Sequence, residues 1–316
     1  MGQVMANKFE HRNFLQGAEF AKWRRLCGDE VIEVAGNHMV IKDAKRGRHA
    51  EIAGAVIKDV KSFAQAIDEA AKSANCVFVR VRPQLIANDE NLTTMREAGF
   101  KPSPRHLYAE NTVIMDLGHS EEELLAAMRK QTRYEIRHLD RHPNLIVDCI
   151  KSSDSASAQA WEDFAKMQAE TAERQGFIPP SRQELLHLRE AFGDQALLYR
   201  AKVDNQVLAY AIILLGLGEA DYFEAASAEQ ARNIPVAYAI QWQIIRDLKA
   251  LGLKYYNLFG IAPEGEPNHR YAKLTTFKRG FGEVVHYVPA QDLSIRGLKY
   301  QLLKWYSLYE KRKRGW

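Results

Sequence analysis

The sequence has few cysteines, and their arrangement argues against a disulfide framework or a thiolate zinc site. Only three occur among 316 residues, Cys27, Cys76 and Cys149, and none forms a C-x-x-C pair. An odd, scattered set fits a reducing compartment, so we expect a cytoplasmic protein. The ten histidines show no H-E-x-x-H and no other metal-ligand spacing. We therefore expect neither a metal nor another cofactor.

Long apolar runs are also missing. No stretch approaches the roughly 20 apolar residues of a membrane span, and the start MGQVMANKFEHRNF has no apolar core of a secretory signal. Several nucleotide and hydrolase motifs are absent too. There is no G-x-x-x-x-G-K-[ST] and no G-x-S-x-G. LGLGEA follows a predicted strand without opening a helix, so it is not a dinucleotide fingerprint.

What is present indicates a globular protein of one large or two ordinary domains. Hydrophobic residues make up 46% of the chain, and the net charge of +4 permits an anionic partner without requiring one. Helical and alternating patterns succeed one another, which predicts a mixed α/β fold with mixed sheets. The polar stretch SSDSASAQA, residues 152–160, is the best candidate for a domain boundary. We expect a first domain of residues 1–145 plus 289–316 and a second of residues 146–288.

Residues 120–142 predict one long helix that begins with a capping box, Ser120 with Glu123. Five cations fall at helical spacing along it: Arg129, Lys130, Arg133, Arg137 and Arg141. They form either a basic binding face or an ordinary solvated face.

The segment LTTFKRGFG, residues 274–282, is the best candidate for chemistry. It places Lys278 between Phe277 and Phe281, with Gly280 and Gly282 close behind. A lysine fixed beside a glycine-rich turn can stabilise the negative charge of a tetrahedral acyl intermediate. The alternative is a basic hairpin whose aromatic residues belong to the core.

The order of the elements suggests an acetyltransferase-like (GNAT) unit. In such units a glycine-rich turn at a helix N-terminus holds the pyrophosphate of coenzyme A. The matching segment here is QARNIPVAYAIQW, where Asn233 and Pro235 replace the glycines. Since proline has no N–H to donate to a phosphate, this segment argues against coenzyme A.

Three segments in this order resemble the FemABX family of peptidoglycan-bridge aminoacyltransferases. They are NTVIMDLGHSEEELLAAMRKQTRYEIR, PVAYAIQWQIIRDLKALGLKYYNLFGI and TTFKRGFG, and FLQGAEFAKWRRLCG resembles the family's N-terminal segment. The resemblance extends from about Phe14 to about Tyr287. It implies two GNAT-like domains, with the C-terminal helix returning to the first. The long coiled-coil arm of many members is absent, which implies a compact form.

The resemblance also implies a function. Family members take an amino acid from aminoacyl-tRNA and attach it to a stem-peptide amine of a peptidoglycan precursor, UDP-MurNAc-pentapeptide or lipid II. This reaction builds the cell-wall cross-bridge. The tail KRKR would contact tRNA phosphates or the inner membrane face, unless it is simply a frayed terminus. The leucine and aromatic stripe of the C-terminal helix is expected to be core.

The same resemblance implies roles for particular residues. Lys278, preceded by Phe277, matches the catalytic lysine. Arg24 and Arg182 match residues that contact the precursor, although Leu186 stands where the family often has tyrosine. The remaining matches are two pocket aromatics and a carboxylate sometimes proposed as a base: Tyr222, Tyr256 and Asp116.

Two other functions remain open. One is a GNAT-fold N-acyltransferase that uses an acyl thioester. The other is a non-catalytic nucleic-acid or cell-envelope binder, which would depend on the basic residues between Arg129 and Arg141 rather than on Lys278.

Overall fold

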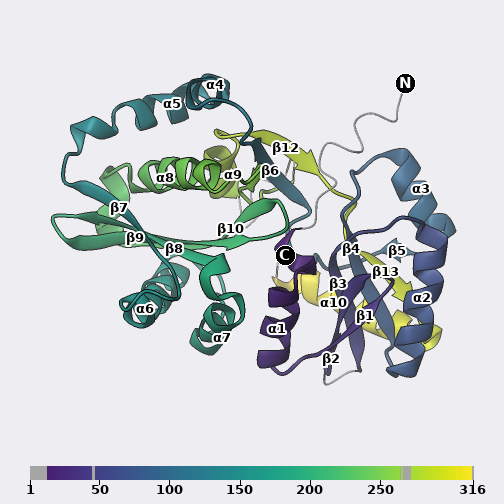
Figure 1. Cartoon of the computed structure of the whole chain (residues 1–316). Helices are drawn as coiled ribbons and strands as arrows, with labels where there is room; N and C mark the ends of the chain where they lie inside the picture. Colours follow the sequence, from purple (N-terminus) through teal and green to yellow (C-terminus); the bar gives the residue numbers. More distant parts are fainter. Residues whose placement is uncertain (1–12, 45–46, 264, 266–271, 315–316) are drawn as a thin grey trace. The chain divides into compact units, whose positions relative to one another are not determined.

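The computed structural model describes residues 13–44, 47–263, 265 and 272–314. The chain forms two compact units, Met1–Asn111 with Val285–Trp316, and Thr112–Val284 (Figure 1). The units therefore divide at 111/112 and 284/285, whereas the sequence analysis placed the divisions at 145/146 and 288/289. The difference arises because strand β6 (Asn111–Asp116) pairs with β11 (Tyr255–Asn257) in the second sheet. The segment 152–160 lies inside the second unit.

The first unit contains one mixed sheet in the order β1-β2-β3-β4-β13-β5, in which β3 and β4 are parallel. Its strands are β1 (Glu30–Val34), β2 (Asn37–Lys42), β3 (His49–Ala55), β4 (Phe78–Pro83), β5 (Lys101–Pro102) and β13 (Gln291–Ser294). Its helices are η1 (Phe14–Gln16), α1 (Ala18–Leu26), α2 (Val60–Ser73), α3 (Asp89–Glu97) and α10 (Gly297–Arg314).

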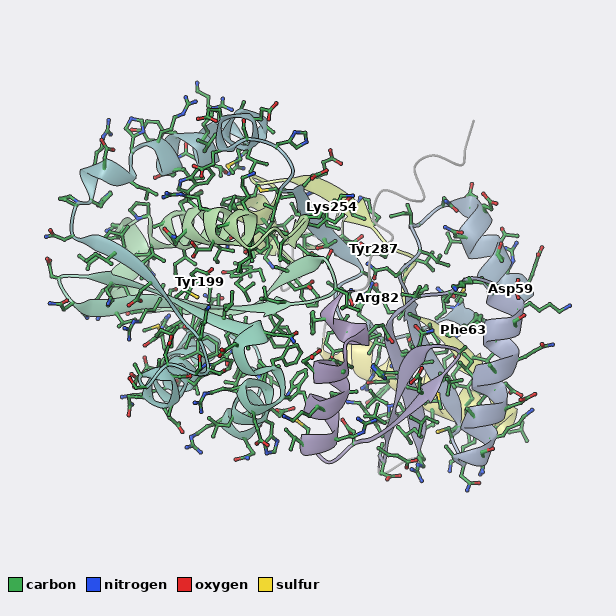
Figure 2. All side chains as sticks on the ribbon, viewed as in Figure 1. Asp59, Phe63, Arg82, Tyr199, Lys254 and Tyr287 are labelled. Carbon is green, nitrogen blue, oxygen red and sulfur yellow. The ribbon has the colours of Figure 1, made fainter. Side chains whose placement is uncertain are left out.

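Strand β4 shows how the two faces of this sheet differ. Val79 and Val81 belong to the apolar core that α2 covers, and Phe63 of α2 packs into the same core (Figure 2). Because side chains alternate along a strand, Arg80 lies on the opposite face. There its guanidinium donates two hydrogen bonds to Asp292 of β13, at 2.8 and 3.0 Å. This paired charge, together with the hydrogen bond that buried Arg82 donates to the Gln84 side chain at 2.7 Å, explains how a strand of sequence FVRVRP is buried throughout.

The second unit contains a sheet in the order β12-β6-β11-β10-β9-β8-β7, in which β10 and β11 are parallel. Its remaining strands are β7 (Leu145–Ile150), β8 (Ala196–Val203), β9 (Gln206–Leu215), β10 (Glu219–Ser227) and β12 (Glu283–His286). Its helices are α4 (Glu121–Ala127), α5 (Lys130–Arg137), η2 (Leu139–Arg141), α6 (Ser157–Gln175), α7 (Arg182–Phe192), η3 (Gly193–Gln195), η4 (Glu229–Asn233), α8 (Val236–Ala250) and α9 (Ala272–Lys278).

Helices cover both faces of this sheet. α6 and α7 lie on one face, and α5, α8 and α9 lie on the other (Figure 1). On the α8 side the core is fully buried, and Tyr199 of β8 donates its hydroxyl to Asp247 of α8 at 3.0 Å (Figure 2). The mixed α/β class with two mixed sheets is therefore confirmed. Residues 196–227 supply three consecutive strands of this sheet, β8, β9 and β10.

The prediction of one long helix over residues 120–142 is wrong, because the helix is interrupted after α4 and resumes as α5. The capping box of Ser120 and Glu123 is present. Met128, however, is extended, and the Arg129 amide donates to the Gly280 carbonyl at 3.0 Å instead of continuing the helix. Arg133 then donates to the carbonyls of Ala126 and Met128, both at 2.9 Å. One of the five expected surface cations therefore caps a helix end.

Candidate active site

The site begins where two parallel strands stop pairing. β10 pairs with β11 from Glu219–Tyr255 to Asp221–Asn257, and β10 then continues to Ser227. The register of β10 against β9 shifts between Tyr222 and Glu224. Such bulges often re-aim side chains beside functional sites. The residues that follow the paired segment of β10 are therefore positioned to line a site rather than to continue the sheet.

Lys278 ends helix α9 at this place. Its side chain is buried, and the residue is only 6% exposed. The ammonium donates a hydrogen bond to the Gly260 carbonyl at 2.9 Å and lies 5.5 Å from the ring centroid of Tyr222. Lys278 is therefore a fixed cation at the diverging strands, on a helix end rather than in a hairpin.

Burial lowers the pKa of Lys278 to about 8, and the negative charge of Glu224 opposes that shift. Glu224 is itself held by Gln168 of α6, whose amide donates to it at 2.8 Å. With a pKa near 8 the lysine remains mostly protonated at pH 7 but loses its proton far more readily than a surface lysine. It is therefore suited to stabilise developing negative charge near neutral pH.

Gln241 of α8 connects the two tyrosines that the sequence placed in the pocket. Tyr256 donates its hydroxyl to the Gln241 side-chain oxygen at 2.8 Å. Burial raises the pKa of both Tyr222 and Tyr256, and Gln241 opposes the rise in each. The Gln241 amide nitrogen is buried without a hydrogen-bond partner among the residues described. Because an unpaired buried donor costs free energy, a substrate bound here would gain affinity by accepting a hydrogen bond from this nitrogen.

Replacing Gln241 with leucine should reduce the activity of this site about tenfold and destabilise the second unit by about 1–2 kcal/mol, because the buried Tyr256 hydroxyl loses its acceptor. Steady-state kinetics and urea denaturation measure the two effects. Gln243→Leu, two residues further along α8, is the matched control, since Gln243 donates a hydrogen bond to Asp247 outside this cluster. Wild-type kinetics in Gln241→Leu would remove Gln241 from the site.

The aromatic neighbours of Lys278 hold its helix in place. Phe277 packs edge-on against Tyr238 and Phe281, with ring centroids 5.2 and 5.1 Å apart. Phe281 is 2% exposed and belongs to the core. Phe277 is thus a packing residue beside the lysine, as the alternative interpretation expected of the aromatic residues, although the segment ends a helix instead of forming a hairpin.

Two other candidates of the second unit lie away from Lys278. Asp116 pairs with Tyr255 at the start of β11, while Gly260 lies beyond the end of that strand. The Asp116 carboxylate accepts a hydrogen bond from the Gly118 amide at 3.0 Å, as a turn-forming aspartate does. Arg182 is exposed at the start of α7 and pairs with Glu162 of α6. The structure brings together Lys278, Tyr222 and Tyr256, but not these two residues.

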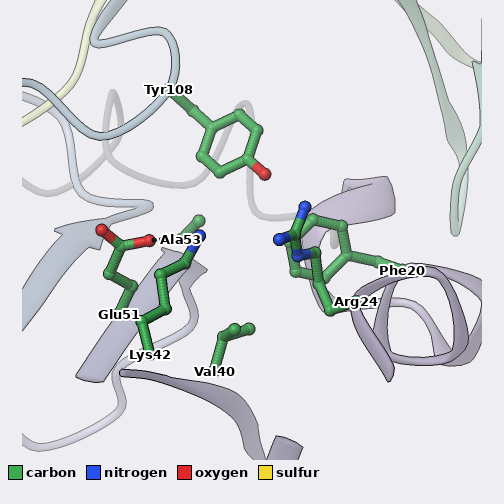
Figure 3. Close-up of a pocket in the computed structure, with 7 residues that line it drawn as sticks. All are labelled: Phe20, Arg24, Val40, Lys42, Glu51, Ala53 and Tyr108. Carbon is green, nitrogen blue, oxygen red and sulfur yellow. Dashed lines mark ion pairs between the residues drawn. The ribbon is translucent and has the colours of Figure 1, made fainter. Parts of the chain in front are cut away.

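Arg24 lines a small hollow of the first unit (Figure 3). It lies in the last turn of α1, donates to Asp29 at 2.7 Å and stacks 5.0 Å from the Trp23 ring centroid. The Tyr108 hydroxyl points toward it across the hollow (Figure 3). Seven residues form the lining: Phe20, Arg24, Val40, Lys42, Glu51, Ala53 and Tyr108.

Two cations and a single carboxylate therefore face this hollow. Lys42 pairs with Glu51 at 3.5 Å. Burial alone would raise the pKa of Glu51, but a hydrogen bond from His49 and the charges of Lys42 and Arg80 outweigh it and lower this pKa to about 2. Glu51 thus stays ionised at every physiological pH. The lining residues together carry one net positive charge, and Asp29 pairs with Arg24 from outside the lining.

Comparisons with known proteins agree with this fold. Residues 126–273 match the family model described as "Acetyltransferase (GNAT) domain". The crystal structure of FemX matches with a TM-score of 0.76 and 14% identity, over 92% of this chain and 94% of that one. The chain has the fold of FemX. The predicted resemblance to the FemABX family is confirmed at this level.

Two further structures share the fold at a greater distance. The C-terminal domain (DUF2156) of a putative lysylphosphatidylglycerol synthetase from Agrobacterium fabrum gives a TM-score of 0.62 at 14% identity, over 93% of this chain and 92% of that one. L-PGS from Bacillus licheniformis gives 0.61 at 14% identity, with the same coverage. No curated protein sequence matches the chain. The match to the GNAT family model, on a chain with this fold, supports an acyltransferase.

Sequence reasoning missed Gln241, Glu224 and Gln168. Gln241 had a signal, because it lies on the helical stripe of Ile244, Ile245 and Leu248 where a polar residue is unexpected. Glu224 and Gln168 had none, since only the fold brings α6 against β10. The part of the chain described here contains no group of three residues able to hold a metal ion, and no helix there is long and apolar enough to cross a bilayer.

Proposed function

We propose that this chain is an aminoacyltransferase that moves an amino acid from aminoacyl-tRNA to the stem-peptide amine of a peptidoglycan precursor, either UDP-MurNAc-pentapeptide or lipid II. The observation that carries the proposal is the buried Lys278 ammonium at the point where β10 and β11 diverge. The FemX fold and the order of the family's segments support the same reaction.

The reaction requires little more than position and charge. The acceptor amine attacks the ester carbonyl of the aminoacyl-tRNA, a C–N bond forms, and the carbonyl oxygen becomes negative. Lys278 donates to that oxygen, as an oxyanion hole does. The C–O bond to the ribose then breaks, the amine loses a proton, and the ribose oxygen gains one. Since the ester is already activated, positioning and oxyanion stabilisation supply most of the rate.

The segment before α8 weighs against a thioester donor. η4 ends at Asn233, and Pro235 occupies the N-cap of α8, so this segment does precede a helix, as its sequence predicted. Proline offers no N–H to a pyrophosphate at the end of a helix. The GNAT domain match nevertheless makes N-acyl transfer from an acyl thioester the second candidate function.

One experiment separates these functions. The protein is incubated with a mixture of charged tRNAs and UDP-linked pentapeptide, and separately with acetyl-CoA and the same acceptor, followed by mass measurement. We expect the acceptor to gain one or more amino-acid masses with tRNA and nothing with acetyl-CoA. An acetyl mass alone would establish the second candidate. No product with either donor would favour a non-catalytic binder.

Arg24→Ala should raise the KM for the UDP-linked acceptor about tenfold with little change in kcat, because a contact to the phosphates acts in the ground state and the transition state alike. Arg96→Ala, on exposed α3, is the control and should behave as wild type. An unchanged KM in Arg24→Ala would remove the hollow of the first unit from acceptor binding.

A further inference from the structure

Helix α10 is anchored to the first unit through the side that carries Tyr300 and Leu303. Tyr300 is 1% exposed and packs with Val77 and Phe78. Its hydroxyl donates to Asp292 at 3.3 Å, so the helix is joined to the Arg80–Asp292 pair. Leu303 adds a partly buried contact on the same side. These contacts fix the orientation of the helix and determine which residues it presents outward.

The outward side is apolar along its length. Leu298 is 89% exposed, Leu302 72%, Trp305 73% and Tyr309 53%. Their spacings of four, three and four residues place them on one face of the helix. We call these four residues the outer stripe. The leucines and aromatic residues of this helix were expected to be core, which holds for Tyr300 and Leu303 but is wrong for the four residues of the outer stripe.

The outer stripe lies in a strongly basic sequence. Between residues 297 and 314 the chain has six lysines and arginines, and Glu310 is the one acidic residue. Lys299 and Lys304 lie within the first turns, and the sequence of the last turn is KRKR. An exposed apolar stripe carrying Trp and Tyr, within a basic helix, is the pattern of a helix that lies in a lipid–water interface.

We propose that the outer stripe of α10 binds the surface of an anionic lipid bilayer, with the leucines and Trp305 among the acyl chains and the basic residues against the headgroups. The charge of the helix argues for this partner. A second copy of the chain would bring two such basic helices together, which like charge disfavours. An anionic bilayer instead satisfies the apolar and the cationic groups at once.

The test is co-sedimentation of the full chain with vesicles of phosphatidylglycerol and phosphatidylcholine in equal parts, and with vesicles of phosphatidylcholine alone. We expect binding to the anionic vesicles, weakened by added salt because the headgroup attraction is screened. The double variant Leu302→Gln, Trp305→Gln should bind about tenfold more weakly or worse, since two large apolar side chains no longer leave water. The matched control, Leu217→Gln, Leu251→Gln, changes two exposed leucines of the second unit and should bind as wild type.

Three results would overturn the proposal. The first is that the wild-type chain does not bind anionic vesicles. The second is that the stripe variant binds them as tightly as the wild type does. The third is that the wild type binds no vesicles but self-associates with rising concentration, and that the stripe variant does not self-associate. Circular dichroism confirms that each variant is folded. The inference is independent of the proposed function, because transfer to the soluble UDP-linked acceptor, measured without vesicles, should be the same in the wild type and the stripe variant.

Discussion

Replacing Lys278 with methionine should lower aminoacyl transfer by about 10²–10³-fold, the loss that follows removal of one oxyanion donor. Methionine has a similar length and fills the same buried space without a charge. The fall should appear in kcat and kcat/KM equally, because the interaction exists only in the transition state. Single-turnover transfer from charged tRNA measures it.

The control for this variant is Arg279→Met, which removes the next cation along the chain from an exposed position. It should retain transfer within about twofold of wild type, as surface changes usually do little. Wild-type turnover in Lys278→Met would refute the role of the lysine. Equal losses in both variants would instead indicate a general basic requirement, such as attraction of tRNA.

The same variant should change how stability depends on pH. The ordinary pKa of lysine is 10.5, and burial brings that of Lys278 to about 8 in the folded protein. Between these values the unfolded chain binds more protons than the folded one, so stability rises with pH across this window. The wild type should therefore gain about 3 kcal/mol relative to Lys278→Met between pH 8 and 10.5. Urea denaturation at several pH values measures the difference, and parallel curves would contradict the low pKa.

The fold was largely predictable because its elements have strong local signals. In β8–β10, apolar residues either alternate with polar ones or form continuous runs, and turn residues separate the strands. Asp204 and Asn205 adopt the positive φ values, 49° and 66°, that a tight turn requires. The capping box at Ser120 and the helix from Val236 were readable for the same reason. Where short-range chemistry decides the structure, the sequence is sufficient.

The division between the units was not readable, because it depends on long-range strand pairing. β6 looks like any other strand in the sequence, and only its register against Tyr255–Asn257 assigns it to the second sheet. The interruption of the helix after α4 has the same origin. The Arg129 amide donates its hydrogen bond to the carbonyl of Gly280, which lies far along the chain, and not to a carbonyl of the preceding helical turn. Asp116 and Arg182 matched the family by position alone. Their roles stay predictions, and the structure supplies a turn and a surface ion pair for them.

Gly282→Ala should destabilise the second unit by about 3 kcal/mol or more, because an added methyl group has no room and the core around it is well packed. A Cβ at this position would lie 2.5 Å from the Ile114 carbonyl oxygen and 3.2 Å from the Met115 amide nitrogen. Both atoms belong to the backbone of β6, which cannot rotate away as a side chain would. The loop after α9 would have to move off β6, and Lys278 would move with it.

Two control variants separate a clash with the backbone from the general effect of adding a methyl group. Gly297→Ala places a methyl group where no atom lies within 4 Å, so it should change stability by less than about 0.5 kcal/mol. Gly280→Ala would meet the Thr132 hydroxyl, a side-chain group that can rotate, and would lie 3.0 Å from the Phe277 carbonyl oxygen, so it should cost less than Gly282→Ala. Urea denaturation ranks the three variants, and transfer activity should fall in the same order. A stable Gly282→Ala protein with full activity would show that the loop does not need its close approach to β6 in order to hold the lysine.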